Sequence, residues 1–167
     1  GMTKTIENLN QTDKDKLNIQ VYEYLRELSY YFEELEKKTK RYIPDYAVKH
    51  HKVFTIADVC EILLIVNKIY SLLVTDIYRT IKIKDDDNTN IRDWLDTYTT
   101  KPEIDLLYYY IERINTFKHY LGSIHNIDIT NNNVIVTIFR PSGGSGELHK
   151  AIKYINSLKN KIKEALP

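Results

Sequence analysis

The chain has 167 residues, with 24 basic and 23 acidic side chains and a formal net charge of +1 at neutral pH. This near-neutral balance excludes a general electrostatic attraction to nucleic acids or anionic membranes, so any such binding has to come from a local patch. Apolar residues make up 43% and charged residues 28% of the sequence, which is typical of a globular protein and not of a disordered or fibrous one. This length is sufficient for one self-supporting hydrophobic core.

The chain shows no internal repeat and no long linker, which indicates a single domain. We predict a helical bundle domain over residues 12–167, preceded by a disordered or tag-derived segment over residues 1–11. Gly1 before Met2 is typical of a residue left by an expression tag.

Cysteine content and hydropathy indicate the compartment. Cys60 is the single cysteine and lies in an apolar run, so it cannot form an internal disulfide, and we expect a buried thiol. The most apolar run, Glu61–Val74, is interrupted by polar residues and is too short to span a membrane. We expect a cytoplasmic protein without membrane contact.

Helical periodicity begins early in the chain. Apolar residues three and four positions apart predict a first helix over residues 12–40, which ends before Pro44 because proline breaks a helix. A second helix is predicted from Thr55 to about Ile83. Apolar residues cover nearly its whole circumference, so we expect it to be the central and most buried element. Residues 84–90 are predicted to form a polar connector.

Three further helices and one hairpin are predicted after the connector. Pro102 fits the first turn of a helix that ends near Gly122, and residues 126–140 read as a β-hairpin around an Asn-rich turn. A Gly-rich turn over residues 141–146 leads into the last helix, residues 147–166. A short helix is also predicted between the connector and Pro102. Its apolar residues share one face: Ile91, Trp94, Leu95 and Tyr98. The predicted fold class is all-α, a four-helix-bundle-like domain with one extra short helix and a small hairpin inserted before the last helix.

Polar residues interrupt the helix predicted over 102–122 in the stretch "ERINTFKHYLG". On a helical wheel His119 projects about 140° away from the apolar stripe around Ile114, so it faces water or a docked ligand. An imidazole can carry a proton near neutral pH, and the guanidinium of Arg113 can bind phosphate oxygens. Such a pair suits metal-free RNA cleavage. Because the two side chains diverge on one straight helix, we expect a bend or a homodimer to bring them together.

The bundle with "RINTFKHY" (Arg113–Tyr120) resembles HEPN domains, all-helical proteins marked by an Arg, four to six intervening residues and a His. The resemblance implies a metal-independent, cofactor-free endoribonuclease of the toxin or anti-phage type, with its site across a dimer. It implies Arg113 as the phosphate-binding residue, His119 as the proton carrier and Asn115 as an orienting group. In this sequence Ile114 follows the arginine directly, so the polar residue is displaced by one position.

Basic residues outside the motif are candidates for RNA contact. We predict that Lys118, Lys150 and Lys153 bind nucleic acid, the last two on a final helix with a local surplus of lysine. The pair of histidines in "KHHK" (Lys49–Lys52) lacks the further ligands that zinc requires, so we predict no metal site.

Two other functions remain open from the sequence. In the first, the polar face around His119 is a solvated or subunit-contacting surface of a non-catalytic scaffold protein, which self-associates or binds a protein partner. In the second, the terminal lysine-rich helix makes the chain a regulatory RNA- or DNA-binding module.

Overall fold

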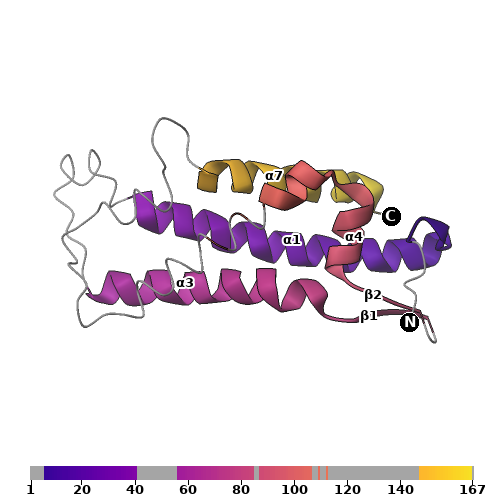
Figure 1. The fold of residues 1–167 in the computed structure, drawn as a ribbon, viewed down its shortest axis with the longest axis horizontal. Helices are drawn as coiled ribbons and strands as arrows, with labels where there is room; N and C mark the ends of the chain where they lie inside the picture. Colours follow the sequence, from indigo (N-terminus) through magenta and orange to yellow (C-terminus); the bar gives the residue numbers. More distant parts are fainter. Residues whose placement is uncertain are drawn as a thin grey trace.

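The computed structural model describes residues 6–40, 56–84, 87–106, 109, 112 and 147–166. In this part of the chain the predicted fold class is confirmed, since most residues are helical and one small antiparallel hairpin accompanies them. Three long helices lie side by side, with α1 (Gln11–Lys40) between α3 (Ile56–Val74) and α7 (Glu147–Ala165) (Figure 1). Both flanking helices run antiparallel to α1 (Figure 1).

The central helix is α1, whose bounds match the predicted first helix to within one residue. It begins after Asn10, whose Oδ1 accepts a hydrogen bond from the backbone N–H of Asp13 at 2.9 Å, as in an N-cap. Its predicted apolar stripe is buried: Leu17, Val21, Leu25, Leu28, Phe32 and Leu35. The prediction that the second helix would be the central one is wrong. Packed elements cover α1 on two sides, whereas α3 leaves Leu64 71% exposed.

A buried hydrogen bond and two ion pairs join α1 to α3. The Tyr24 hydroxyl donates to the backbone carbonyl of Leu72 at 2.7 Å inside the core. Two ion pairs lie outside the core. The distance from the ammonium nitrogen to a carboxylate oxygen is 3.2 Å for Lys68 and Glu27, and 3.0 Å for Lys38 and Glu61. These contacts fix the antiparallel alignment of the two helices.

On the other side, α1 packs against the apolar face of α7. Four of the residues predicted for that face are buried: Ile152, Ile155, Leu158 and Ile162. Two polar contacts lie beside them. The Asn156 amide donates to the Glu33 carboxylate at 3.3 Å, and the Lys159 ammonium donates to the Ser29 hydroxyl at 3.4 Å.

The second helix ends earlier than predicted, at Val74 and not near Ile83. The chain continues in a 3-10 turn, η2 (Asp76–Tyr78), and an antiparallel pair of strands, β1 (Ile81–Lys84) and β2 (Asp87–Thr89). Ile77 and Ile81 are buried all the same. Their four-residue spacing mimics a helix, but the turn and the strand satisfy it equally well.

The hairpin in the described residues therefore lies within the predicted helix end and connector, and it ends directly before α4. In its register Ile81 lies opposite Thr89, and both are buried. The hairpin predicted over residues 126–140 and the Gly-rich turn after it lie outside the described residues.

The short helix α4 (Ile91–Tyr98) is confirmed with its predicted apolar face. Asn90 caps it, since Oδ1 accepts the backbone N–H of Asp93 at 2.7 Å. Trp94 is buried, and its indole N–H donates to Asn18 Oδ1 at 3.1 Å, which ties α4 to α1.

Residues 6–11 are ordered, which differs from the disordered or tag-derived segment predicted over residues 1–11, and residues 1–5 lie outside the described residues. Residues Ile6–Asn8 form a 3-10 turn, η1, and the side chains of Ile6 and Leu9 are buried in the main core. Two apolar side chains three positions apart are enough to hold this turn against the bundle. No helix in the described ranges has the length and apolar character needed to cross a membrane.

Candidate nucleic-acid interface

The helix that leads to the predicted catalytic motif begins as the sequence indicates. Residues 101–106, 109 and 112 are helical. Thr100 precedes the first turn, where its backbone N–H donates to the Glu103 carboxylate at 2.9 Å and its carbonyl accepts the N–H of Ile104 at 3.1 Å. This is half of a capping box. Ile104 is buried, whereas Glu112 is exposed.

Four of the predicted site residues lie outside the described residues: Arg113, Asn115, Lys118 and His119. The nearest described residue is Glu112, directly before the arginine. The structure places Lys150 and Lys153 on α7, and the side chain of Lys153 is exposed.

A groove of about 700 Å³ runs along α7 and contains Lys153. We call it the α7 groove. It is open to solvent, and its described lining comes from a single helix: Ile152, Lys153, Asn156, Ser157, Asn160, Lys161 and Glu164.

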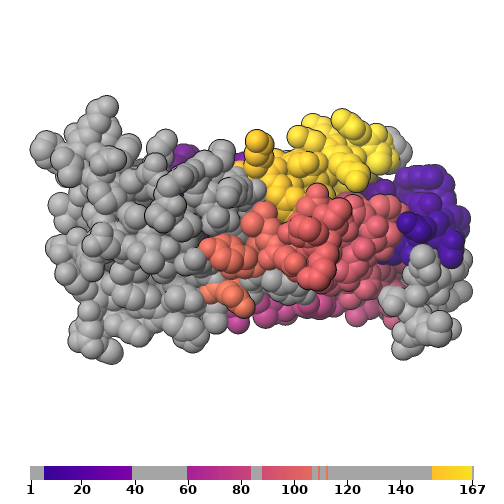
Figure 2. Space-filling view, turned by 45° about the horizontal axis from the view of Figure 1, so that its top comes forward, coloured from indigo at the N-terminus to yellow at the C-terminus, as the bar shows by residue number. Residues whose placement is uncertain are grey.

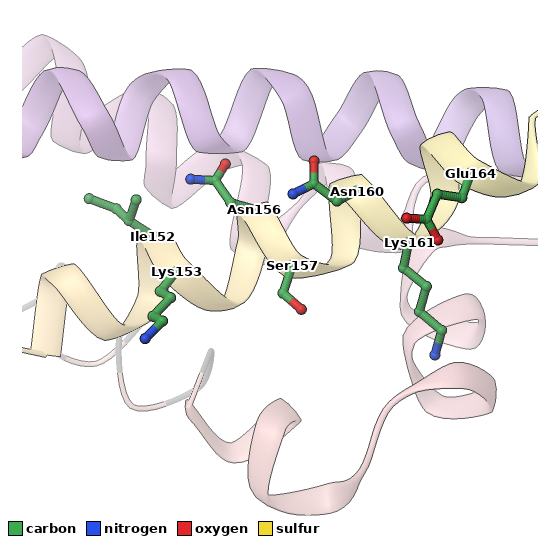
Figure 3. A pocket seen from close by; sticks show the side chains of 7 residues that line it. All are labelled: Ile152, Lys153, Asn156, Ser157, Asn160, Lys161 and Glu164. Carbon is green, nitrogen blue, oxygen red and sulfur yellow. The ribbon is translucent and has the colours of Figure 1, made fainter.

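Two rows of side chains line the α7 groove. Lys153, Ser157 and Lys161 are exposed and point away from α1, in a row that we call the α7 stripe (Figure 3). Asn156 and Asn160 point toward α1 instead (Figure 3). Each row has a spacing of four residues, which keeps side chains on one face of a helix.

The charges of the α7 stripe have no partner among the described residues. Lys153 and Lys161 take part in no ion pair there, whereas Lys159, on another face of the helix, contacts Ser29 of α1. Glu164 lies at the C-terminal end of the groove and is also exposed. The stripe therefore presents two free ammonium groups and a hydroxyl, with one carboxylate near its end.

The helix α4 and the first turns of the helix that follows it, which we call the motif helix because it leads to the predicted catalytic motif, lie beside α7. The space-filling view shows residues 91–106 along one flank of α7 (Figure 2). Tyr154 of α7 is half-buried there. Loss of solvent raises the pKa of its hydroxyl to about 12, and the charge of Glu103 adds to the shift. Tyr154 is therefore neutral at physiological pH, so its hydroxyl adds no negative charge to this side of α7.

Cys60 is exposed, so the prediction of a buried thiol is wrong. Only one face of α3 packs against α1, through Ile62, Val66 and Ile69, and Cys60 lies on the opposite face. Within the residues that the structure describes, no three His, Cys, Asp or Glu side chains are grouped so that they could hold a metal ion.

No family model, curated protein or solved structure matches the chain.

Of the three residues in the α7 stripe, the sequence singled out Lys153 but not Ser157 or Lys161. The signal is the four-residue spacing of these three residues. It is hidden in the sequence because Lys159 and Lys163 lie on other faces of the same helix. Only the position of α1 shows which face of α7 remains open.

Proposed function

We propose that this protein binds RNA and cleaves it without a metal ion. The observation that carries the proposal is the pair Arg113 and His119, with Asn115 between them, in a predicted helix. The similarity of this motif to HEPN domains supports the same reaction.

In the proposed reaction the His119 imidazole removes the proton from a ribose 2′-hydroxyl. The 2′-oxygen attacks the adjacent phosphorus, the new O2′–P bond forms, and the P–O5′ bond breaks. Arg113 stabilises the negative charge that develops on the phosphorane. The second histidine of a homodimer, as imidazolium, gives a proton to the leaving 5′-oxygen. The products are a 2′,3′-cyclic phosphate and a 5′-hydroxyl.

The described part of the chain supports this proposal at one point. Glu112 is helical and exposed. In a helix that continues to residue 122, as the sequence predicts, position 119 lies seven residues further on the same face. The imidazole would then be accessible to RNA.

The test is cleavage of a single-stranded RNA in the presence of EDTA. Arg113→Ala and His119→Ala are each expected to lower the rate by at least about 100-fold, the usual share of general acid–base or electrostatic catalysis. Arg26→Ala, which removes an exposed arginine from α1, is the control and should cleave normally. Cleavage that needs Mg²⁺, or that both variants retain, contradicts the proposal.

A second candidate function is self-association without catalysis, and one feature of α3 favours it. The face opposite the core carries uncharged side chains at alternating steps of four and three residues, the spacing of a helix–helix seam. The residues of this α3 seam are Cys60, Leu64, Asn67, Ser71 and Val74. Asn67 lies at its centre, where its amide could donate to and accept from the same residue of an antiparallel second copy.

Light scattering of Leu64→Glu against the unchanged chain tests this candidate. A buried seam predicts that the charge converts a dimer to a monomer. Glu23→Gln, a substitution at an exposed position of α1, is the control. If the unchanged chain is a monomer at micromolar concentration, the α3 seam does not self-associate. A dimer that neither binds nor cuts RNA would favour the scaffold function.

A further inference from the structure

We infer that the α7 groove holds the sugar–phosphate backbone of a single RNA strand, with Lys153, Ser157 and Lys161 as its contacts. The inference rests on the proposed function, and it names the surface that holds the substrate. It adds Ser157 and Lys161 to the lysine that the sequence indicated.

The first argument is the geometry of the α7 stripe. Its three residues lie four positions apart on a regular helix, so each step along the axis is about 6 Å and the whole row spans about 12 Å. Their side chains point in one direction, away from α1 (Figure 3). A row of donors with this regular spacing suits a linear chain of phosphates better than a single anion.

The second argument is that these donors are available. The Lys153 and Lys161 ammonium groups form no ion pair with a described residue, and the Ser157 hydroxyl is exposed between them. Other polar groups of the same helix are occupied, since Asn156 donates to Glu33 and Lys159 donates to Ser29. Lysine and serine are typical contacts to phosphate oxygens.

The third argument concerns the kind of ligand. Pockets for small molecules enclose most of their ligand. The α7 groove is open along its length, which suits an extended chain better than a small molecule. Contacts from such a surface give affinity without reading the bases, as is usual for backbone binding. Glu164 repels phosphate, and it therefore limits the stripe at its C-terminal end.

Binding is measured by fluorescence anisotropy with a labelled, 2′-O-methylated oligouridylate, which cannot be cleaved through its 2′-oxygen. Affinity is recorded over a range of salt concentrations. For single strands, the slope of log K against log salt is negative, and each lost phosphate contact makes it shallower by about 0.7. The double variant Lys153→Ala/Lys161→Ala is therefore expected to make the slope shallower by about 1.4 and to weaken binding roughly tenfold at moderate salt.

Three further variants sharpen this test. Lys163→Ala is the matched control, because it removes the same charge from an exposed position of the same helix outside the groove. It should leave affinity nearly unchanged. Ser157→Glu places a carboxylate inside the stripe and should weaken binding at least as much as the double variant. Glu164→Gln should tighten binding. Circular dichroism confirms that these exposed substitutions leave the helices intact.

The outcomes separate the two proposals. If the unchanged chain binds the RNA and the double variant keeps the affinity and slope of Lys163→Ala, the groove inference is wrong and the proposed function stands. If the unchanged chain does not bind the RNA, the proposed function itself is overturned. If the stripe variants lose binding to polyglutamate but not to RNA, the groove holds an acidic peptide and the inference is wrong.

Discussion

At the scale of single residues, Tyr24 shows how polar groups are accommodated in this core. Its ring is buried between α1 and α3, and its hydroxyl donates to the Leu72 carbonyl at 2.7 Å. A buried hydroxyl is tolerated because it has this partner. Burial also raises the pKa of Tyr24, and the charges of Asp76 and Glu27 add to the shift, so the folded chain strongly favours the neutral form.

Tyr24→Phe is expected to reduce the free energy of unfolding by about 1–2 kcal/mol at pH 7, because the buried Leu72 carbonyl loses its donor. Urea denaturation measures this difference. Tyr30→Phe, which removes an exposed hydroxyl from the same helix, is the control and should change little. Equal stability of both variants would show that the hydrogen bond contributes nothing.

The same residue predicts a pH dependence. Because folding raises the pKa of Tyr24, the folded chain holds this proton more tightly than the unfolded chain. Its contribution to stability is complete below about pH 10, the ordinary pKa of tyrosine, and is lost as the pH rises above that value. Tyr154 adds to the loss between about pH 10 and its pKa of about 12. Tyr24→Phe should therefore flatten the alkaline decline in unfolding free energy, and an unchanged decline would contradict the assignment.

At the scale of elements, caps and tethers decide where the short helices form. The eight residues of α4 could not form a stable helix alone. Asn90 caps the first turn, and Trp94 ties the helix to Asn18 of α1. The motif helix depends in the same way on Thr100 and Glu103 at its start.

Asn90→Ala is expected to lower the free energy of unfolding by about 1 kcal/mol, since the Asp93 N–H loses its acceptor. Asn90→Asp keeps an acceptor oxygen at the same place and should retain most of the stability. Thermal unfolding of the two variants provides the comparison. A loss of similar size in both would indicate that the cap is not the cause.

The sequence predicts those helices and faces that a local residue pattern determines. It does not predict those that tertiary packing determines. The apolar faces of α1, α4 and α7 follow from periodicity alone, and the structure confirms them. The end of α3 was not predictable, because Ile77 and Ile81 keep a helical spacing within a turn and a strand. The exposure of Cys60 and the α7 stripe depend on where α1 packs, and periodicity within one helix carries no such information. The assignments of Arg113, Asn115, Lys118 and His119 stay predictions.

At the scale of the whole molecule, one helix organises the core. α1 contacts α3 along one side and α7 along another, and buried residues of all three belong to one apolar cluster. The exposed faces of the flanking helices differ. α7 carries Lys153 and Lys161, which form no ion pair with a described residue, while α3 carries the uncharged seam around Leu64. The bundle thus presents two chemically distinct surfaces.

The contrast between core and surface gives a prediction for large-to-small substitutions. Phe32→Ala removes a fully buried ring from α1 and should cost about 3–5 kcal/mol of unfolding free energy. Leu64→Ala, on the outer face of α3, should cost less than about 0.5 kcal/mol in a monomer. Chemical denaturation at several protein concentrations checks both. A cost for Leu64→Ala that grows with concentration would reveal a contact between copies.

The position of α1 also has a consequence for biosynthesis. The ribosome completes α1 first, then residues 41–146, and only afterwards the helix that covers one side of α1. At about 5–20 residues per second, this interval lasts on the order of ten seconds. Throughout it, the side of the nascent helix that carries Ser29 and Glu33 lacks its contacts with α7 and remains open to chaperones or aggregation. A message truncated before codon 147 would make that exposure permanent, so quality control should remove such fragments quickly.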